Sequence, residues 1–387
     1  MHKALLITNK GAESIVEKEV KGLVKCKNIK KNDSCVICEV KDLLEICRLA
    51  YRAQSVSRVI LLLAEFKVET KLEKTLANFK KSIEKLDLKE WSKKTAKVKS
   101  KRLGEHEFNS VDIGTEAGKI LFNKIKEKNK IIVKVNYKNP EMIFYIYVYD
   151  NKGYFGIDFS GFDLSKRQYK IFNHPESLNS ISGYVAAKEA DIDEKKVIID
   201  PFMGSGVIVI EAALDVLKFP IRYYDKEKLF FTKLDFFKKQ RKKFFEDEDK
   251  KTSDKKTNIY GYDAQLRYLK ATQKNSKLAG VNKKINLSKV SVEWLDTKFE
   301  KNSVDVIVTD PPRYGINRNI SKLKKTYNEL FYQAEYILKK SGLIVIITRD
   351  FKLLEESAKN HKFKISEKYI LNQGKDIFNI IKFQREK

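Results

Sequence analysis

Three aspartates in the second half of the chain each follow a short apolar run, at the point where a strand of a parallel sheet would end. They are Asp200, Asp263 and Asp310, preceded by the runs 197–199, 259–262 and 304–309. The carboxyl ends of parallel strands meet at one edge of a sheet, and open α/β sheets bind their ligands there. We therefore expect the three carboxylates to surround one ligand site.

The residues after Asp200 form a turn that suits the close approach of a ligand. Pro201 biases Asp200 away from helical backbone angles, so its carboxylate is presented at the end of the strand. Gly204 and Gly206 flank Ser205, and glycine lets the backbone come close to a ligand before the next helix begins. Taken alone, this stretch is equally consistent with an ordinary turn between a strand and a helix.

Asp263 follows Asp200 after an intervening helix, as expected for the end of the adjacent strand in a βαβ unit. A carboxylate at this place offers two acceptors to the two hydroxyl groups of a ribose. A helix is predicted over 265–278, with Gly280 near its C-cap. The pair of aspartates turns the glycine turn into a candidate nucleotide site.

The run Asp310-Pro311-Pro312-Arg313-Tyr314 is the most specific chemical signal in the chain. The two prolines fix an extended turn and leave backbone carbonyl groups without helical N–H partners. The carboxylate of Asp310 and the carbonyl of Pro311 then form a pair of acceptors for an exocyclic NH2 group. An aryl amine is a poor nucleophile because its lone pair is delocalised, and two acceptors help to pyramidalise it. The turn therefore indicates methylation of an amino group.

The composition indicates a polyanionic partner. The 387 residues carry 79 Lys and Arg against 52 Asp and Glu, which gives a net charge of +27. Such an excess favours nucleic acid, because each neutralised phosphate releases counterions. A generally lysine-rich proteome would explain the many lysines, but it explains the net charge less well. No apolar run is long enough to span a membrane and no secretory signal is visible, so a cytoplasmic protein is expected.

The four cysteines lie early in the chain, at positions 26, 35, 38 and 47. Cys35 and Cys38 have the spacing of a zinc pair, but they lie in a predicted strand and no histidine is near. We expect buried thiols that act as small apolar residues, with neither a metal site nor a structural disulfide.

The order of predicted elements divides the chain into four segments. Residues 1–65 alternate strand and helix in the manner of a ferredoxin-like α+β domain, and residues 66–156 form a second small α+β unit. Residues 157–173 link these units to residues 174–387. In this last segment strands and helices alternate as in a Rossmann-like sheet that is mostly parallel, and an antiparallel hairpin closes it.

A strand over 95–102 has a wholly basic face. Small or apolar residues alternate there with Lys97, Lys99 and Lys101, and Arg102 follows. A run of charge is usually a solvated face. Here all the charges have one sign and one side, which favours contacts with phosphates.

Residues 219–258 mix phenylalanines with many lysines and arginines. We expect the aromatic face of this insertion to pack on the domain and its basic face to point to solvent. Its end, 246–256, has no apolar residue and is predicted to be a mobile surface loop.

Several of these stretches resemble the family of THUMP-containing RNA methyltransferases. The run Lys101–Ser110 with Gly118 is similar to the centre of the THUMP domain, and Tyr154–Gly161 to its exit. The Asp200–Gly206 element is similar to Asp-Pro-x-Cys-Gly-Ser-Gly, with Met203 at the cysteine position. The junction between the two regions of the family is matched in the linker at Leu164, Lys166, Arg167 and Tyr169.

The turn at 310–313 resembles the (Asp/Asn)-Pro-Pro-aromatic motif of amino methyltransferases. It departs from that motif because Arg313 stands where the aromatic residue is expected and Tyr314 follows. In the family the aromatic residue stacks on the target base. Either Tyr314 takes this role, or Arg313 stacks through its guanidinium plane.

The resemblance implies a ferredoxin-like and THUMP region in front of a class I methyltransferase domain with S-adenosyl-L-methionine as its cofactor. It further implies an enzyme that forms N2-methylguanosine at position 6 or 10 of tRNA, which is held by its acceptor stem and 3′-CCA end. We expect this enzyme to be a monomer. No metal is needed, because the sulfonium is already an activated leaving group. A paired guanosine would have to be flipped out of its stack, at a cost of about 2–5 kcal/mol.

The resemblance also assigns roles to single residues. The catalytic turn is Asp310, Pro311, Pro312, Arg313 and Tyr314. The cofactor residues are His174, Asp200, Phe202, Gly204, Ser205, Gly206, Asp263, Ala264 and Asp296, of which Asp296 would reach the adenine amino group. The RNA contacts are Lys97, Lys99, Lys101, Arg102 and Arg167.

Three other functions share these features. The same chemistry could act on ribosomal RNA, or the turn could serve methylation of adenine N6 in DNA or RNA. A non-catalytic RNA-binding protein would explain Arg313, but the three intact aspartates argue against it.

Overall fold

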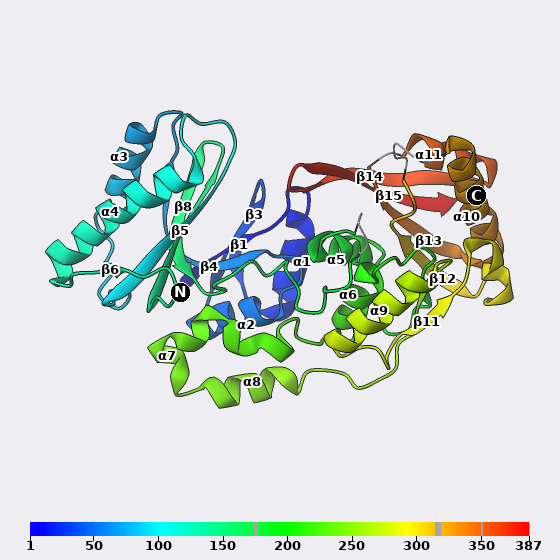
Figure 1. Cartoon of the computed structure of the whole chain (residues 1–387), viewed down its shortest axis with the longest axis horizontal. Helices are drawn as coiled ribbons and strands as arrows, with labels where there is room; N and C mark the ends of the chain where they lie inside the picture. The colour runs from blue at the N-terminus through cyan, green and yellow to red at the C-terminus, as the bar shows by residue number, and fades with distance from the viewer. Residues whose placement is uncertain (174–176, 314–318, 350, 387) are drawn as a thin grey trace.

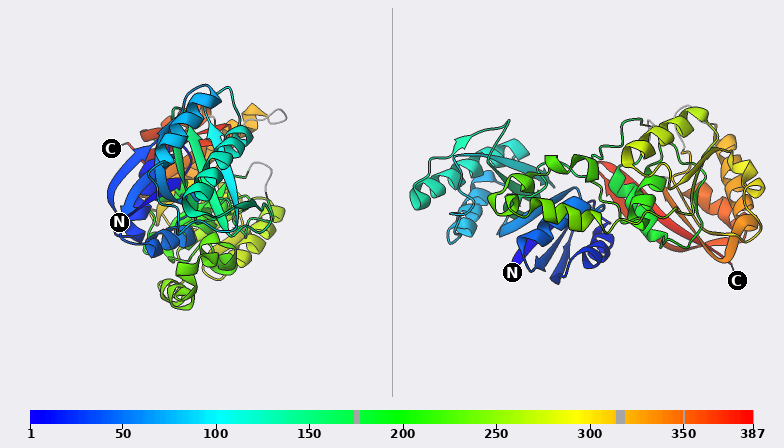
Figure 2. Two further views of the ribbon diagram at one scale, coloured as in Figure 1. Left: turned by 90° about the vertical axis from the view of Figure 1, so that its left-hand side faces the viewer. Right: turned by 90° about the horizontal axis from the view of Figure 1, so that it is seen from below.

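The computed structural model describes residues 1–173, 177–313, 319–349 and 351–386. Two lobes lie side by side along the long axis of the molecule, and each is built on one sheet (Figure 1). The view from below in Figure 2 shows the same arrangement, with the N-terminal half at one end and the C-terminal half at the other.

The N-terminal lobe holds an eight-stranded sheet of order β2-β3-β1-β4-β8-β7-β5-β6. Its strands are β1 (His2–Ile7), β2 (Lys27–Asn32), β3 (Cys35–Val40), β4 (Arg58–Lys67), β5 (Thr95–Leu103), β6 (Lys134–Val135), β7 (Met142–Tyr149) and β8 (Lys152–Asp158). Its helices are α1 (Glu13–Leu23), α2 (Leu43–Arg52), α3 (Leu72–Ile83) and α4 (Ser110–Asn129). Strand β4 pairs with both β1 and β8, so one sheet runs through both small units. The division proposed at residues 65 and 66 falls inside β4.

The two faces of this sheet differ. Apolar residues of the four helices and of one sheet face form a single large core. Gly114 and Gly118 of α4 show how closely this face is packed, because a Cβ at either would meet Ser100 or Val98 of β5. The other face carries a smaller cluster that includes Tyr145, Tyr147 and Tyr154, all buried.

The C-terminal lobe is a seven-stranded sheet of order β11-β10-β9-β12-β13-β15-β14. Its strands are β9 (Ile198–Asp200), β10 (Ile259–Asp263), β11 (Asn286–Lys289), β12 (Val304–Thr309), β13 (Leu338–Thr348), β14 (Phe363–Gln373) and β15 (Asp376–Arg385). The helices beside it are α5 (Ser180–Glu189), α6 (Val207–Val216), α9 (Leu266–Ala279), α10 (Ile320–Ile337) and α11 (Lys352–Asn360). The first five strands of the order are parallel, and β15 is antiparallel to both β13 and β14. The expected fold class, a mostly parallel sheet with an antiparallel C-terminal hairpin, is confirmed.

Some elements differ from their predicted bounds. The sequence pattern at 131–137 predicts a strand, of which only β6 forms. The pattern at 288–292 predicts another, and β11 begins earlier than that. The sequence pattern predicts a helix from residue 330. Helix α10 begins ten residues earlier, because its N-cap Asn319 accepts a hydrogen bond from the Ser321 N–H. Such caps define a helix start more sharply than apolar periodicity does.

The insertion at 219–258 joins the lobes. It contains η1 (Tyr223–Lys228), η2 (Phe230–Lys233), α7 (Asp235–Lys238) and α8 (Arg241–Asp249), and lies against the N-terminal lobe below α2 (Figure 1). Its phenylalanines from Phe230 to Phe245 belong to the N-terminal core, where Phe245 meets Tyr51 edge-on at 5.0 Å between ring centroids. The loop expected over 246–256 is wrong in its first part, because α8 continues to Asp249 and Glu248 is buried against Arg48, with 2.7 Å between Nε and Oε1. The partner of Glu248 is 200 residues away, beyond the reach of a local pattern.

The cysteines are free thiols. Cys35 lies in the smaller cluster and Cys38 in the large core, so the two point to opposite faces of β3. Burial raises the pKa of both thiols to about 12, as expected for thiols that serve as packing residues. Among the helices described, none is long and apolar enough to cross a membrane.

Candidate active site

Strands β9, β10 and β12 are neighbours, and their carboxyl ends open into one cavity of about 850 Å³. A volume of this size fits a nucleotide-sized ligand. The predicted site residues on its wall are Asp200, Phe202, Gly204, Ser205, Asp263, Ala264, Asp310, Pro311, Pro312 and Arg313. Three aspartates from three separate strands therefore meet at one site. The predicted residues His174 and Tyr314 lie outside the described part of the chain.

Asp200 is the buried carboxylate at the centre of this edge. It is 1% exposed, and it accepts hydrogen bonds from Thr309 Oγ1 at 2.6 Å and from the Phe202 N–H at 3.1 Å. Burial raises the pKa of Asp200 to about 7, and the nearby Asp310 and Asp263 contribute to the increase. The bond from Thr309 ties the strand that carries Asp310 to the strand that carries Asp200.

The glycine turn is shaped by its neighbours in the fold. Gly206 has φ of +83°, and a Cβ there would clash with Thr272 of α9. Thr272 also donates to the carbonyl of Gly204 at 2.8 Å. Gly206 is thus required by its left-handed conformation and by helix packing, and it is not among the residues on the cavity wall.

Asn275 holds the same turn from the other side. Its Nδ2 donates to the carbonyls of Ser205 at 3.0 Å and Phe172 at 2.8 Å, and its Oδ1 accepts from the Phe172 N–H. The linker is therefore fixed to the glycine turn immediately before residues 174–176. Asn275 is fully buried in α9.

Asp263 links the end of β10 to this turn. Its Oδ2 accepts from the Gly204 N–H at 3.2 Å, and its Oδ1 accepts from the Gln265 N–H at 2.8 Å. Partial burial raises the pKa of Asp263, while these two bonds lower it. The carboxylate is half-buried and open to the cavity, so each oxygen keeps a lone pair for a ligand hydroxyl.

The Asp310 turn is held on both flanks. The Arg313 guanidinium pairs with the Asp310 carboxylate through two bonds, from Nε to Oδ1 at 3.1 Å and from Nη2 to Oδ2. The guanidinium also lies 4.8 Å above the ring of Phe378. On the other flank, the Tyr327 hydroxyl of α10 donates to the Pro312 carbonyl at 2.5 Å.

The role of Asp296 at the adenine stays a prediction. The residue is exposed and lies outside the cavity wall, and its backbone N–H donates to Gln333 Oε1 at 2.9 Å. It belongs to the short helix η3 (Val292–Thr297), whose first residues, Val292 and Glu293, line the cavity instead.

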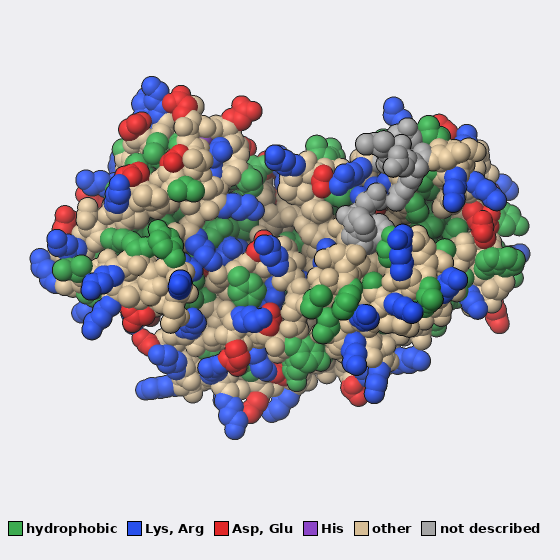
Figure 3. All heavy atoms as spheres, viewed as in Figure 1, with side chains coloured by type: hydrophobic (Ala, Val, Ile, Leu, Met, Phe, Trp, Pro, Cys, Tyr) green, Lys and Arg blue, Asp and Glu red, His purple; other side chains and the backbone are tan. Residues whose placement is uncertain are grey.

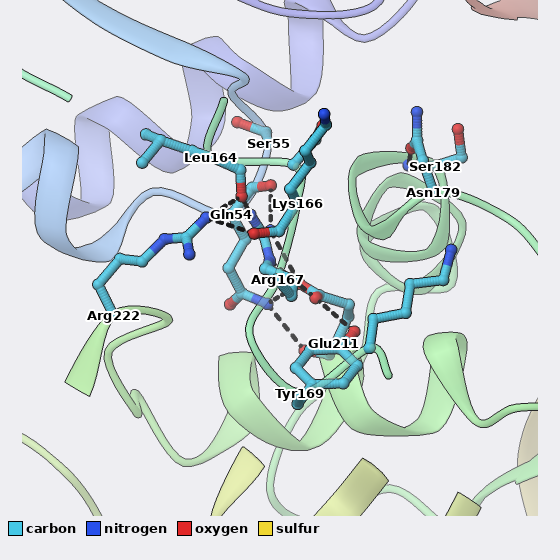
Figure 4. A network of polar contacts seen from close by, with 12 residues as sticks. Gln54, Ser55, Leu164, Lys166, Arg167, Tyr169, Asn179, Ser182, Glu211 and Arg222 are labelled. Atoms are coloured by element: carbon cyan, nitrogen blue, oxygen red, sulfur yellow. Dashed lines mark hydrogen bonds and ion pairs between the residues drawn. The ribbon is translucent and has the colours of Figure 1, made fainter. Parts of the chain in front are cut away.

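The predicted contact of Arg167 with RNA is wrong, because the side chain is fully buried and cannot reach RNA. Its guanidinium donates to both oxygens of Glu211, at 3.0 and 3.1 Å, and to the Gln54 carbonyl at 2.7 Å. The Tyr169 hydroxyl donates to the same carboxylate at 2.8 Å. Figure 4 shows this network, in which the N-terminal lobe, the linker and α6 converge on Glu211.

The basic strand β5 keeps its expected face. Lys97 donates to the Tyr137 carbonyl at 3.0 Å and Lys99 to the Gly161 carbonyl at 2.6 Å, while Lys101 is exposed. Desolvation lowers the pKa of each of these three lysines, so an added anion would stabilise their charged forms. On the face of the molecule shown in Figure 3, Lys and Arg side chains outnumber acidic ones over both lobes.

Arg102 is turned inward to its own loop. Its Nη1 donates to the Gly104 carbonyl at 2.5 Å and lies 3.2 Å from His106 Nδ1. The role of Arg102 in RNA binding stays a prediction.

Several cavity residues were not among those predicted from the sequence. Arg267 and Lys322 are exposed on the wall and add positive charge to it, and Ser177 places its Oγ 2.9 Å from Ser205 Oγ. Arg267 could have been found from its place just after Asp263, at the start of a helix. Phe378, which lies beneath Arg313 and not on the cavity wall, could not have been found, because it comes from the far hairpin.

The chain matches two family models. The model described as RMKL-like, methyltransferase domain matches residues 167–377, and the THUMP domain model matches residues 73–158. The first match covers more than half of the 387 residues. The chain belongs to the RMKL-like methyltransferase domain family. It is a methyltransferase that uses S-adenosylmethionine, and its THUMP domain implies RNA binding.

Proteins similar to this member of the RMKL-like family cover most of its length. The tRNA (guanine(6)-N2)-methyltransferase of Methanocaldococcus jannaschii is 29% identical over 367 residues, which are 93% of each chain. The protein of the same name from Archaeoglobus fulgidus is 26% identical over 293 residues, which are 75% of this chain and 70% of that one. The crystal structure of SMU.472 in complex with SAH has the same fold, with a TM-score of 0.81 and 17% identity over 100% of this chain and 98% of that chain.

The cavity fits S-adenosylmethionine by the chemistry of its donor and acceptor groups. Asp263 presents a carboxylate suited to a ribose diol, and Asp200 presents one suited to an ammonium group. The Gly204–Ser205 backbone borders the same space, and Phe202 and Val292 add apolar surface.

Proposed function

We propose that this protein methylates the N2 amine of a guanosine in tRNA. The observation that carries the proposal is the meeting of Asp310-Pro311-Pro312 with Asp200 and Asp263 in one cavity. An amine acceptor turn and a nucleoside-type site are thereby adjacent, as direct transfer between two bound groups requires. The tRNA (guanine(6)-N2)-methyltransferases at 29% and 26% identity support guanosine as the target and favour position 6 over position 10.

Different residues of the cavity bind different parts of S-adenosylmethionine. When bound, this cofactor supplies a methyl group activated by its sulfonium. Asp263 accepts hydrogen bonds from the ribose hydroxyls, and the ionised Asp200 faces the amino-acid end. Glu293 takes the place at the adenine amino group that Asp296 does not reach.

Asp310 and the Pro311 carbonyl receive the two N–H groups of the guanine amine. Each oxygen of a carboxylate can accept more than one hydrogen bond, so the pairing of Asp310 with Arg313 is compatible with a bond from the amine. Hydrogen bonds to both N–H groups orient the nitrogen lone pair and stabilise the positive charge that develops on it. Loss of one N–H proton after transfer restores the neutral, now secondary, amine.

The THUMP region brings the RNA to this site in our proposal. Lys97, Lys99 and Lys101 lie on one face of β5, where phosphates of the acceptor stem would neutralise them. The target nucleotide is flipped into the cavity, at the general cost of about a few kcal/mol.

The test is methyl transfer in vitro to unmodified total tRNA, followed by nucleoside analysis and mapping of the product. We expect N2-methylguanosine at position 6, and the product at position 10 would correct only the position. N6-methyladenosine as the product would show that the amine is that of adenine. Transfer to ribosomal RNA in preference to tRNA would replace the proposed substrate. Cofactor binding without any methyl transfer would indicate a non-catalytic RNA-binding protein.

A further inference from the structure

The residue that departs from the aromatic motif, Arg313, is tied to the catalytic carboxylate. We propose that Arg313 and Phe378 are positioning residues, which hold the Asp310 carboxylate at the cavity wall in the orientation that receives the amine. This inference rests on the proposed role of Asp310 in amine methylation. It explains why an arginine can stand at the aromatic position of the turn.

The contact between Arg313 and Asp310 fixes both the position and the plane of the carboxylate. The Nε and Nη2 atoms each donate to a different carboxylate oxygen. A planar guanidinium bound through two parallel bonds allows little rotation of its partner, whereas a lysine would act as a point charge. The Asp310 side chain is 16% exposed and the Arg313 side chain 7%. Both side chains therefore border the cavity, and the arginine is the less exposed of the two.

Phe378 fixes the guanidinium in turn. Its ring lies 4.8 Å below the Arg313 guanidinium and is fully buried in β15. A stacked ring restrains the plane of the guanidinium and adds a cation–π attraction. With so little of its surface exposed, Arg313 does not offer an open plane to a target base.

The hairpin that carries Phe378 is itself held at its other strand. Phe378 pairs in register with Leu371 of β14, and the next residue, Asn372, donates its N–H to the Lys10 carbonyl of the N-terminal lobe at 2.9 Å. Gly11 is packed so closely that an added Cβ would clash with the Ile370 carbonyl oxygen. The support of Asp310 thus reaches from the catalytic turn to the RNA-binding lobe.

The experiment compares two variants with two matched controls. Arg313→Lys keeps the charge but removes the two-bond pairing, and Phe378→Leu removes the ring. Arg349→Lys is the control for the first, because Arg349 also lies near the Phe378 ring, at 5.3 Å, and pairs with Asp376. Phe383→Leu is the control for the second, because Phe383 is a buried ring of the same strand that packs on Phe331.

We expect single-turnover methyl transfer to saturating tRNA to fall about 10- to 100-fold in Arg313→Lys and Phe378→Leu, as a misplaced catalytic group would cause. The affinities for S-adenosylmethionine and tRNA should stay within about twofold, because neither residue is assigned to binding. The two controls should keep the wild-type rate. Thermal unfolding of the two phenylalanine variants should shift to a similar extent, which separates a positioning effect from a loss of stability.

The outcomes distinguish this inference from the proposed function. A wild-type enzyme that methylates tRNA together with variants of unchanged rate would overturn the inference alone. Equal loss of rate in Phe378→Leu and Phe383→Leu would also overturn it, because the effect would then be one of general packing. A wild-type enzyme that transfers no methyl group to an amine of tRNA would remove both.

Discussion

Two arginine–carboxylate pairs of this molecule have similar chemistry and opposite surroundings. Arg167 and Glu211 are both 0% exposed, and Glu211 also accepts hydrogen bonds from Tyr169 and Gln54. Arg313 and Asp310 form the same kind of contact, but Asp310 faces a cavity. The first pair is closed by protein groups and joins the two lobes, whereas the second borders the space that a ligand would fill.

The comparison shows that the partners of a charge decide its role more than its place in a motif does. Arg167 and Arg313 both lie in stretches that resemble RNA methyltransferases, and the resemblance predicts contact with RNA for Arg167 and, as the alternative to Tyr314, for Arg313. The buried network in Figure 4 makes Arg167 part of the protein interior, whereas Arg313 stacks on Phe378 and pairs with Asp310 beside the cavity.

The largest effect should come from breaking the closed pair. Arg167→Met leaves Glu211 as a buried carboxylate without its cation, so the free energy of unfolding should fall by about 3–5 kcal/mol. Chemical denaturation measures this decrease. Lys119→Met is the control, because its pair with Glu116 is solvent-exposed and should change stability by about 1 kcal/mol or less. Equal decreases in the two variants would contradict the structural role of Arg167.

The pH dependence of cofactor binding tests whether Asp200, which lines the same cavity as Asp310, binds the ammonium group of the cofactor. Its pKa of about 7 means that it is protonated below this pH in the free protein, and only its ionised form attracts an ammonium group. The affinity for S-adenosylmethionine should therefore fall up to about tenfold for each pH unit below 7 and level off above it. Calorimetric titration from about pH 5.5 to 7.5 spans this transition, and Asp200→Asn should remove the dependence.

Through Asp200, a rise in pH lowers the stability of the free protein but raises its affinity for the cofactor. The pKa of Asp200 is raised from its ordinary value of 3.8, so the folded free protein takes up a proton that the unfolded chain does not. The contribution of Asp200 to the free energy of unfolding is greatest at low pH, below the ordinary pKa, and is lost as the pH rises through about 7. A cofactor affinity that rises as the pH falls would contradict the assigned role.

The lysines of β5 test whether cations that a ligand can reach bind RNA, in contrast to the buried Arg167. Lys97→Gln with Lys101→Gln should weaken RNA binding and lower the slope of log K against log salt by about one for each phosphate that is no longer neutralised. Fluorescence anisotropy at several salt concentrations measures both. The control, Lys74→Gln with Lys81→Gln, changes exposed lysines of α3 on the opposite face of the sheet. If both doubles lower the slope equally, binding depends on net charge and not on this face.

The smallest effects concern the adenine end of the cavity. Glu293→Gln should weaken binding of S-adenosylmethionine by about 3- to 10-fold, the usual range for one hydrogen bond. Asp296→Asn should leave the affinity unchanged, because this side chain is not on the cavity wall. Equilibrium dialysis with both variants shows which of the two carboxylates binds the adenine. A larger loss of affinity in Asp296→Asn than in Glu293→Gln would assign this role to Asp296.

The sequence predicted the fold well where the information was local. Strand β12 lies at its predicted place, 304–309, because an apolar run bounded by Asp310-Pro311 leaves little choice. The meeting of Asp200, Asp263 and Asp310 follows from parallel strand order and needs no knowledge of a contact. The continuity of the N-terminal sheet through β4 is not predictable in this way, because pairing between β4 and β8 joins segments that are far apart in the chain.

The candidate site was predicted less completely, for the same physical reason. Arg167 is buried against Glu211, and Arg313 stacks on Phe378, and neither partner is visible from local spacing. Which residues after β11 line the cavity depends on where this short strand ends, since a shift of a few residues exchanges one side chain for another on the wall. Long-range pairs and strand ends therefore limit what a single sequence can tell about this site.

The role of Asp310 is tested by the rate of N2-methylguanosine formation by Asp310→Ala on unmodified tRNA, measured in a single turnover beside the wild type. Removal of the acceptor should lower the rate about 100- to 1,000-fold, the usual effect of removing one hydrogen bond that stabilises a transition state. The affinities for S-adenosylmethionine and tRNA should remain close to those of the wild type. A variant that methylates tRNA at the normal rate would contradict the assignment of Asp310 to the reacting amine.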